Sequence, residues 1–205
     1  MLLFRVAKNS MRPASFLLWL GLSAGLYSCA AFANPPQKEW RFNALLDGKP
    51  IGEHRYSLER HGDELELFSE ADFSVKYLYI EFYSYHHTAR ERWQSGCLNE
   101  LRARTEEQGD ITTVDGDKNA GAFMVRDAKG AREIPAPCVS TYAYWNIAML
   151  RQTHLLNPQT GEWLEIKVQQ LGNDPVKTSK RNLTARHYRV TTDKARIDLW
   201  YSVQD

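Results

Sequence analysis

ADFSVKYLYIEFYSYHHTARERW, residues 71–93, contains neither glycine nor proline. Aromatic and β-branched side chains recur along it with a period of two, which is typical of β-strands. A strand of this length is rare, because ordinary strands run to roughly 5–6 residues. We therefore expect either one long, curved strand or two strands that meet at a sharp bend near residues 80–81. In both cases this segment is the centre of an antiparallel sheet.

The rest of the chain predicts shorter strands separated by turns. Leu98 and Leu101 depart from simple alternation, which indicates a β-bulge near Asn99. Turns are expected wherever glycine, asparagine and aspartate gather, including residues 115–119 and 172–175. The further strands are expected at residues 40–46, 51–60, 64–69, 98–105, 111–114, 122–125, 132–134, 163–171, 183–191 and 195–203.

The segment after the Pro-Ala-Pro sequence at 135–137 predicts one helix. Ser140 or Thr141 is placed to cap it, and apolar residues follow at helical spacing as far as Leu150. About ten strands, one helix and no alternation of strands with helices give an all-β, mainly antiparallel fold. We expect a curled sheet, a half-open barrel or a clam, with the helix lying across it.

The N-terminus has the features of a signal peptide over residues 1–33. A basic region precedes an apolar run of 12 residues at 16–27, and Ala31-Phe32-Ala33 fits a cleavage site. Because that run is shorter than the ~20 residues of a membrane span, we expect cleavage and a single periplasmic domain over residues 34–205. The alternatives are an uncleaved anchor and a lipoprotein cleaved at Cys29.

Charge and cysteine content fit an exported protein that does not bind nucleic acid. The 26 basic and 25 acidic residues give a net charge of +1, and residues 1–33 hold three basic residues and no acidic one. The remaining domain therefore carries −2 and has no basic cluster for nucleic acid. Cys97 and Cys138 are its two cysteines, and in an oxidising compartment we expect them to form a disulfide; two unrelated thiols are the alternative.

Motifs of catalytic and metal sites are missing from the sequence. It has no GxSxG, no phosphate-binding glycine loop, no CxxC and no HxH or HExxH spacing. His86 and His87 are neighbours in a predicted strand and would point to opposite faces. We therefore expect no metal and no cofactor, and we favour a non-enzymatic protein over a hydrolase or isomerase. If there is catalysis, His54 and His87 are the first candidates, beside a Ser, Asp or Glu.

Aromatic residues are too numerous for the surface, and most of them are expected to fill the core. A curled antiparallel sheet closed by one helix often encloses an apolar cavity, and Tyr or Trp at its rim can contact the polar end of a lipid. The candidate ligand-binding residues are Tyr77, Tyr79, Tyr85, His87, Trp93, Tyr144 and Trp145.

Several short motifs are spread over the chain. They are LDGKPIGEH at 46–54, FSVK at 73–76, YH at 85–86, ERW at 91–93, GCL at 96–98, YWN at 144–146, LLN at 155–157, TG at 160–161 and LWY at 199–201. Together they resemble an exported proteobacterial family described only as a domain of unknown function. The resemblance covers residues 40–201 and implies an envelope location and an antiparallel sheet similar to those of periplasmic half-barrel lipid carriers, but no reaction. Because such families continue to a further Trp-containing strand, it also predicts a shortened C-terminus.

From these observations the leading hypothesis is a periplasmic protein that binds an apolar or lipid-like ligand in a curled β-sheet. The alternative is a structural or protein-interaction domain of the envelope with no small ligand. An apolar cavity would favour the first, and a long exposed edge strand or a flat apolar patch would favour the second.

Overall fold

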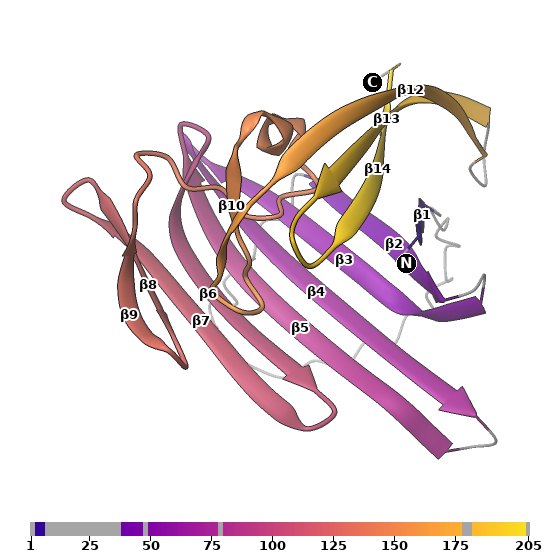
Figure 1. Cartoon of the computed structure of the whole chain (residues 1–205), viewed down its shortest axis with the longest axis horizontal. Helices are drawn as coiled ribbons and strands as arrows, with labels where there is room; N and C mark the ends of the chain where they lie inside the picture. The colour runs from indigo at the N-terminus through magenta and orange to yellow at the C-terminus, as the bar shows by residue number, and fades with distance from the viewer. Residues whose placement is uncertain (1–2, 7–37, 47–48, 78–79, 178–181, 204–205) are drawn as a thin grey trace, which may run out of the picture.

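The computed structural model describes residues 3–6, 38–46, 49–77, 80–177 and 182–203. A nine-stranded antiparallel sheet dominates it, with strand order β1 to β9, so each strand pairs with its neighbours in the sequence (Figure 1). The strands are β1 (Leu3–Val6), β2 (Lys38–Leu46), β3 (Lys49–His61), β4 (Glu64–Tyr77), β5 (Ile80–Gln94), β6 (Cys97–Glu107), β7 (Asp110–Asn119), β8 (Ala122–Asp127) and β9 (Gly130–Ile134).

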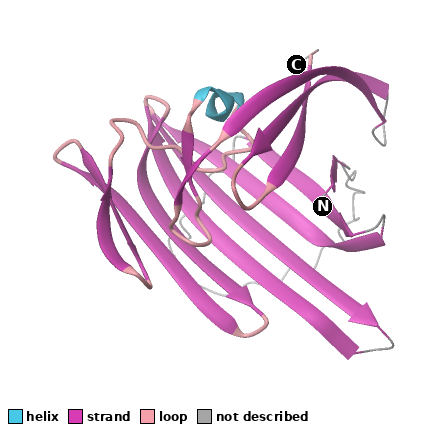
Figure 2. Cartoon of the chain, viewed as in Figure 1, coloured by secondary structure: helices cyan, strands magenta, loops and turns pink. Residues whose placement is uncertain are grey.

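Two smaller sheets follow. β10 (His154–Leu156) and β11 (Trp163–Glu165) form a hairpin, and β12 (Lys167–Lys177), β13 (Asn182–Thr191) and β14 (Arg196–Ser202) form a three-stranded sheet. All pairings between strands are antiparallel and none of the sheets is closed, so the all-β, curled-sheet prediction is confirmed (Figure 2). Among the described residues no helix is long and apolar enough to cross a membrane.

The central stretch forms two strands that turn back on each other. β4 ends at Tyr77, β5 begins at Ile80, and these two residues face each other in the register. The two-strand alternative is therefore confirmed, but the chain reverses in a hairpin where a bend was expected. The bulge is confirmed as well: Arg92 pairs with Glu100 and Trp93 with Leu98, so Asn99 is the extra residue.

The predicted helix is wrong, because only a 3-10 turn, η1 (Ile147–Arg151), forms in that segment. Asn146 caps it by accepting a hydrogen bond from the Ala148 N–H at 3.0 Å. The residues before Asn146 alternate between two apolar clusters: Ala143 and Trp145 pack against one, Tyr142 and Tyr144 against the other. An extended chain can present side chains in opposite directions in this way, whereas a helix would gather them on one stripe.

The turn predicted at residues 115–119 is also wrong, because β7 continues through it. Gly116 packs under Phe123, and a Cβ placed on it would lie 2.6 Å from the phenyl ring. Asp117 points to the opposite face, where Arg102 Nη2 lies 2.6 Å from its Oδ1. A glycine between two aspartates resembles a turn in the sequence, but here the glycine makes room for an aromatic ring.

The turn predicted at residues 172–175 lies within β12. A bulge at Leu171 shifts the register between Gln170 and Gly172, and pairing with β13 then continues to Lys177. Asp174 is held in this strand by the indole N–H of Trp200, which donates to it at 2.9 Å. The reversal falls between Lys177 and Asn182, beyond the described residues.

Alternation along the strands gives the nine-stranded sheet two different faces. The outer face carries a ladder of ion pairs; Arg102, for example, lies near Glu100, Asp115 and Asp117. These pairs are largely exposed, so each stabilises the fold by ~1 kcal/mol at most. The inner face packs against the segment that follows β9, and its Tyr56 lies near Tyr201 of the three-stranded sheet.

Two apolar cores lie on the inner side. The first joins β5–β9 to the connecting segment through Trp93, Leu101, Phe123 and Leu156, among others. The second joins the three-stranded sheet to the region around η1. Its buried members are Met149, Leu155, Ile166, Val190 and Leu199.

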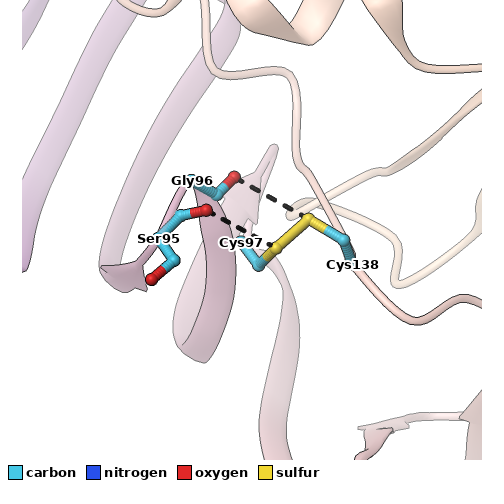
Figure 3. The surroundings of a disulfide bond; sticks show 4 residues. All are labelled: Ser95, Gly96, Cys97 and Cys138. Carbon is cyan, nitrogen blue, oxygen red and sulfur yellow. Dashed lines mark hydrogen bonds between the residues drawn. A yellow bond between two sulfur atoms is a disulfide. The ribbon is translucent and has the colours of Figure 1, made fainter.

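A disulfide attaches the connecting segment to the large sheet. Cys97, at the start of β6, is bonded to Cys138, as predicted (Figure 3). The backbone N–H of Leu98 also donates to the carbonyl of Val139 at 2.9 Å. The connecting segment is thus fixed to β6 before it crosses the inner face.

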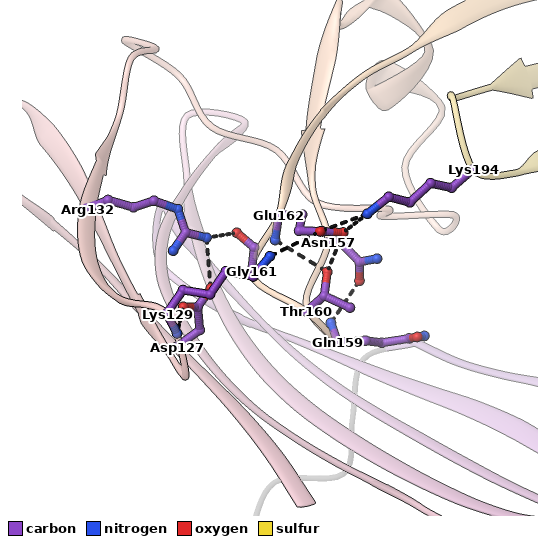
Figure 4. A network of polar contacts seen from close by, with 9 residues as sticks. All are labelled: Asp127, Lys129, Arg132, Asn157, Gln159, Thr160, Gly161, Glu162 and Lys194. Carbon is purple, nitrogen blue, oxygen red and sulfur yellow. Dashed lines mark hydrogen bonds and ion pairs between the residues drawn. The ribbon is translucent and has the colours of Figure 1, made fainter.

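A second attachment is polar and joins three hairpins (Figure 4). The Glu162 carboxylate accepts hydrogen bonds from Lys194 at 2.8 Å and from Lys129 at 3.3 Å. Arg132 donates to Asp127 and to the carbonyl of Gly161. The β8–β9, β10–β11 and β13–β14 hairpins are therefore tied together at one point.

Replacing both Cys97 and Cys138 by serine should lower the free energy of unfolding by about 3–4 kcal/mol, because the unfolded chain regains the entropy of a loop of 41 residues. Urea unfolding of the oxidised wild type and of the double variant measures this difference. The control is the wild type kept under reducing conditions, and its free energy of unfolding should match that of the double variant. Equal urea midpoints with and without reductant would show that the disulfide does not constrain the fold.

Candidate functional site

A row of polar and aromatic side chains crosses the inner face outside both apolar cores. These residues come from β3, β4, β5 and β6, and antiparallel register brings them together. Tyr56 lies opposite Ser69, and His87 lies between Ala71 on one side and Thr105 on the other. We call this row the inner seam; its members are His54, Tyr56, Ser69, Tyr85, His87, Glu91 and Thr105.

His87 is a buried, neutral histidine of the seam. Only 4% of its surface is exposed, and its Nδ1 lies 2.9 Å from the Thr105 hydroxyl. Burial, followed by the charge of the neighbouring His86, lowers the pKa of His87 to about 4. The imidazole is therefore uncharged at neutral pH.

His54 forms a second polar group beside it. Its Nε2 lies 2.9 Å from Ser69 Oγ, and its Nδ1 lies 3.3 Å from the Tyr56 hydroxyl. Burial, followed by the charge of His87, lowers the pKa of His54 to about 3. A general base works best with a pKa near the working pH, so this pair is poorly suited to activate Ser69.

Tyrosines line the space around these histidines. Tyr85 stacks on Phe73 with ring centroids 5.2 Å apart, and burial raises the pKa of its phenol. Tyr201 on β14 donates to the Tyr144 carbonyl at 3.0 Å. Burial, and then the neighbouring Tyr144, raises the pKa of Tyr56 well above its usual value. These phenols stay uncharged at any physiological pH.

Glu91 is the one carboxyl group of the seam. It is 4% exposed and accepts a hydrogen bond from the Trp93 indole N–H at 2.9 Å. Burial raises the pKa of Glu91 to about 7, although the nearby Thr141 hydroxyl and Trp93 act to lower it. Glu91 is therefore close to half protonated at neutral pH, a state found at functional sites more often than in ordinary cores.

Thr141, near Glu91, and Trp145, whose ring packs against Trp93, each have one polar atom with no well-formed hydrogen bond among the described residues. The two atoms are the hydroxyl oxygen of Thr141 and the indole nitrogen of Trp145, and both are buried. Buried polar groups are hydrogen-bonded in the large majority of cases. The Glu91 end of the seam thus has unused hydrogen-bonding capacity.

A family model, the domain of unknown function DUF6134, matches residues 42–205, four-fifths of the chain. The chain belongs to the DUF6134 family. The match covers the last part of β2, all of β3 to β14 and every residue of the inner seam. No curated protein and no solved structure was found to match. The predicted resemblance to a family of unknown function is confirmed, while its proteobacterial origin and its likeness to lipid carriers stay predictions.

The seven predicted ligand-binding residues of this DUF6134 domain fall in different places. Tyr85 and His87 belong to the seam, whereas Trp93 and Trp145 pack edge to face in the first core, with ring centroids 5.7 Å apart. Tyr144 packs against the second core and lies near Tyr85 and Tyr56. The side chains of Tyr77 and Tyr79 lie outside the described residues.

Of the other members of the seam, the sequence pointed only to His54, as a candidate for catalysis beside a Ser, Asp or Glu, and did not point to Tyr56, Ser69, Glu91 or Thr105. Ser69 and Thr105 stand out only when the register places them beside His54 and His87. Glu91 lies ~13 Å along the strand from His87 at the usual rise per residue, so spacing alone does not join the two residues in one site. The signal available in the sequence was that Glu91, a charged residue, alternates in phase with the apolar residues Tyr85 and Trp93.

Two clefts open on the surface of the described part of this DUF6134 domain, and one of them lies at the Tyr85 end of the seam. One, of about 380 Å³, is lined by residues such as Lys129, Arg132 and Glu162, whose charges are already paired. The other, of about 340 Å³, is lined by Gly52, Phe73 and Tyr85 and also by His86 and Asp72, which lie 2.5 Å apart. Neither cleft is lined by the seam histidines His54 and His87.

Glu91→Gln should change how stability depends on pH. In the unfolded chain the carboxyl loses its proton near pH 4.5, but in the folded chain it keeps the proton until about pH 7. The wild type should therefore lose about 3 kcal/mol of unfolding free energy, relative to Glu91→Gln, as pH rises through this window.

Urea unfolding of both proteins at several pH values between 4.5 and 7.5 measures this difference. The buried histidines act in the opposite direction, since they destabilise the fold as pH falls below about 6.5. Their effect is common to both proteins and cancels in the comparison. A difference that stays constant with pH would mean that Glu91 ionises normally.

Proposed function

We propose that this DUF6134 domain is an exported binding protein for a neutral amphiphile, an apolar molecule with an uncharged polar group. The inner seam is the proposed site. The observation that carries the proposal is the composition of the seam: it lies outside the two separate apolar cores and combines aromatic rings with buried polar groups, among them two uncharged histidines. A domain with only a structural role would be expected to form one continuous apolar core there.

The charge state of the seam supports an uncharged polar group on the ligand. Both histidines are neutral at pH 7, and so are the tyrosines. An anionic head group would enter this buried region without a counter-charge, which is costly, and a cationic one would find only the partly ionised Glu91. A hydroxyl, carbonyl or amide could bond to His54, His87 or the unpaired atoms of Thr141 and Trp145.

The shape of the sheet supports an apolar body. Gly52 and Ala71, which have little or no side chain, lie next to the stacked rings of Phe73 and Tyr85. The ends of β4 to β7 that are far from the three-stranded sheet extend beyond it (Figure 1). A chain or ring entering from that end would meet aromatic side chains first, and the histidines next.

The proposed compartment is the periplasm. The predicted signal peptide and the disulfide both support it, because disulfides persist in oxidising compartments. Cleavage after Ala33 would remove β1 and leave β2 as the edge of the large sheet. An exposed edge strand is a ready surface for another protein, and this favours the envelope-interaction alternative as the second candidate.

Native mass spectrometry of the protein purified from its own envelope tests the proposal, followed by solvent extraction of any bound compound. We expect a co-purifying mass of lipid size. His87→Gln should lower affinity for that compound roughly fivefold, the equivalent of one lost hydrogen bond of about 1 kcal/mol. The matched control is His86→Gln, because the adjacent His86 points to the outer face.

A wild-type protein that carries no ligand would contradict the binding proposal and favour the protein-interaction alternative. Equal binding by the two variants would place the ligand away from the seam. Circular dichroism establishes that both variants are folded. A serine-directed covalent probe tests for catalysis. Labelling of Ser69 would show that His54 activates the Ser69 hydroxyl in spite of the low pKa of the His54 imidazole.

A further inference from the structure

We propose that Glu59, His61 and Glu66 form a binding site for a divalent transition-metal ion such as zinc, on the outer face at the β3–β4 hairpin. The site is separate from the inner seam, on the opposite side of the same sheet. It offers one imidazole nitrogen and two carboxylate oxygens, a set of ligand types that suits such ions.

The distances between the three donor atoms fit one ion. His61 Nε2 lies 3.4 Å from Glu59 Oε2 and 3.7 Å from Glu66 Oε2, and all three atoms lie within 4.8 Å of one another. Zinc binds such atoms at ~2.0–2.2 Å in tetrahedral geometry, so two ligands of one ion lie about 3.4 Å apart. Only small side-chain movements are needed to close the site.

Strand register places these ligands together. Glu59 and His61 are two residues apart on β3 and therefore point to the same face. Glu66 lies directly opposite Glu59 on β4. The hairpin between them is a tight turn at Gly62 and Asp63, so the positions of the three side chains are set by one rigid unit.

Charge also favours a cation here. Like charges directly opposite each other on paired strands are destabilising, and Glu59 and Glu66 are such a pair. Arg90 Nε lies 3.3 Å from the Oε1 oxygen of Glu66, which leaves the Oε2 oxygen directed at His61. An outer partner that orients a ligating carboxylate is a regular feature of metal sites.

The exposure of the cluster suggests an open site. The side chain of His61 is 54% exposed and that of Glu66 29%, so an ion can enter from solvent. Three protein ligands leave a fourth position for water or another molecule, as in zinc sites that are not purely structural. Histidine spacing within one strand does not reveal the cluster, because the third ligand lies across a hairpin.

Zinc titration of the untagged, chelator-treated protein by calorimetry tests the proposal. We expect one bound ion per chain, and binding at least ~10-fold weaker in His61→Gln and in Glu66→Gln. Cobalt, used as a second probe, should give the visible absorption of a tetrahedral site in the wild type but not in His61→Gln. His86→Gln is the matched control, since it removes another outer-face histidine that is paired with a carboxylate.

Wild-type binding that is retained in His61→Gln, or the absence of stoichiometric binding, would overturn the proposal and leave the cluster as an ordinary ion pair. Because all three residues are on the surface, the variants should fold normally, and their circular dichroism spectra establish this. Bound amphiphile, measured on the same samples, should not change. The two proposals can therefore fail independently.

Discussion

Antiparallel pairing of β4 with β5, from Glu64–Gln94 to Tyr77–Ile80, determines which side chains share the inner face. Side chains alternate between the faces, so a slip of one residue would exchange every one of them. His86 would then replace His87 in the seam, and Arg90 or Arg92 would replace the buried Glu91. The outer ladder of ion pairs opposes this slip, because it would bury several arginines. The register thus fixes both the fold and the site.

The polar groups of the seam are buried, but burial is costly for any of them that is charged or lacks a hydrogen bond. They must be desolvated on the inner face, and burial makes their charged forms costly. His54 and His87 meet this demand by staying neutral, and each has a hydroxyl partner. Glu91 meets it only in part, since its pKa lies near 7, and Thr141 and Trp145 have unused hydrogen-bonding atoms. A bound neutral group would complete these hydrogen bonds, and this connects the energetics of the fold to the proposed function.

Local patterns in the sequence predicted the large sheet because strand alternation and turn residues are local signals. They also predicted the Asn99 bulge and the disulfide, although the pairing of Cys97 with Cys138 rested on compartment and not on geometry. The errors occurred where tertiary contacts override local preference. Gly116 makes room for a phenyl ring, residues 172–175 are held by pairing with β13, and the segment before Asn146 divides its side chains between two cores. For the site, Tyr85 and His87 were found from their phase, but Ser69, Thr105 and Glu66 acquire meaning only through partners on other strands.

The central claim is that the inner seam, and not the outer face, holds an apolar ligand. Photo-crosslinking with an uncharged amphiphile that carries a diazirine on its apolar chain tests it directly, with labelled residues located by fragmentation mass spectrometry. The account predicts labelling at Phe73 and Tyr85 on the inner face, which excess unlabelled amphiphile suppresses. Labelling of these two residues is compared with labelling of Phe68 and Phe82, which are exposed apolar side chains. Phe68 lies on the outer face. Labelling confined to Phe68 and Phe82, or labelling that excess amphiphile does not suppress, would contradict the account.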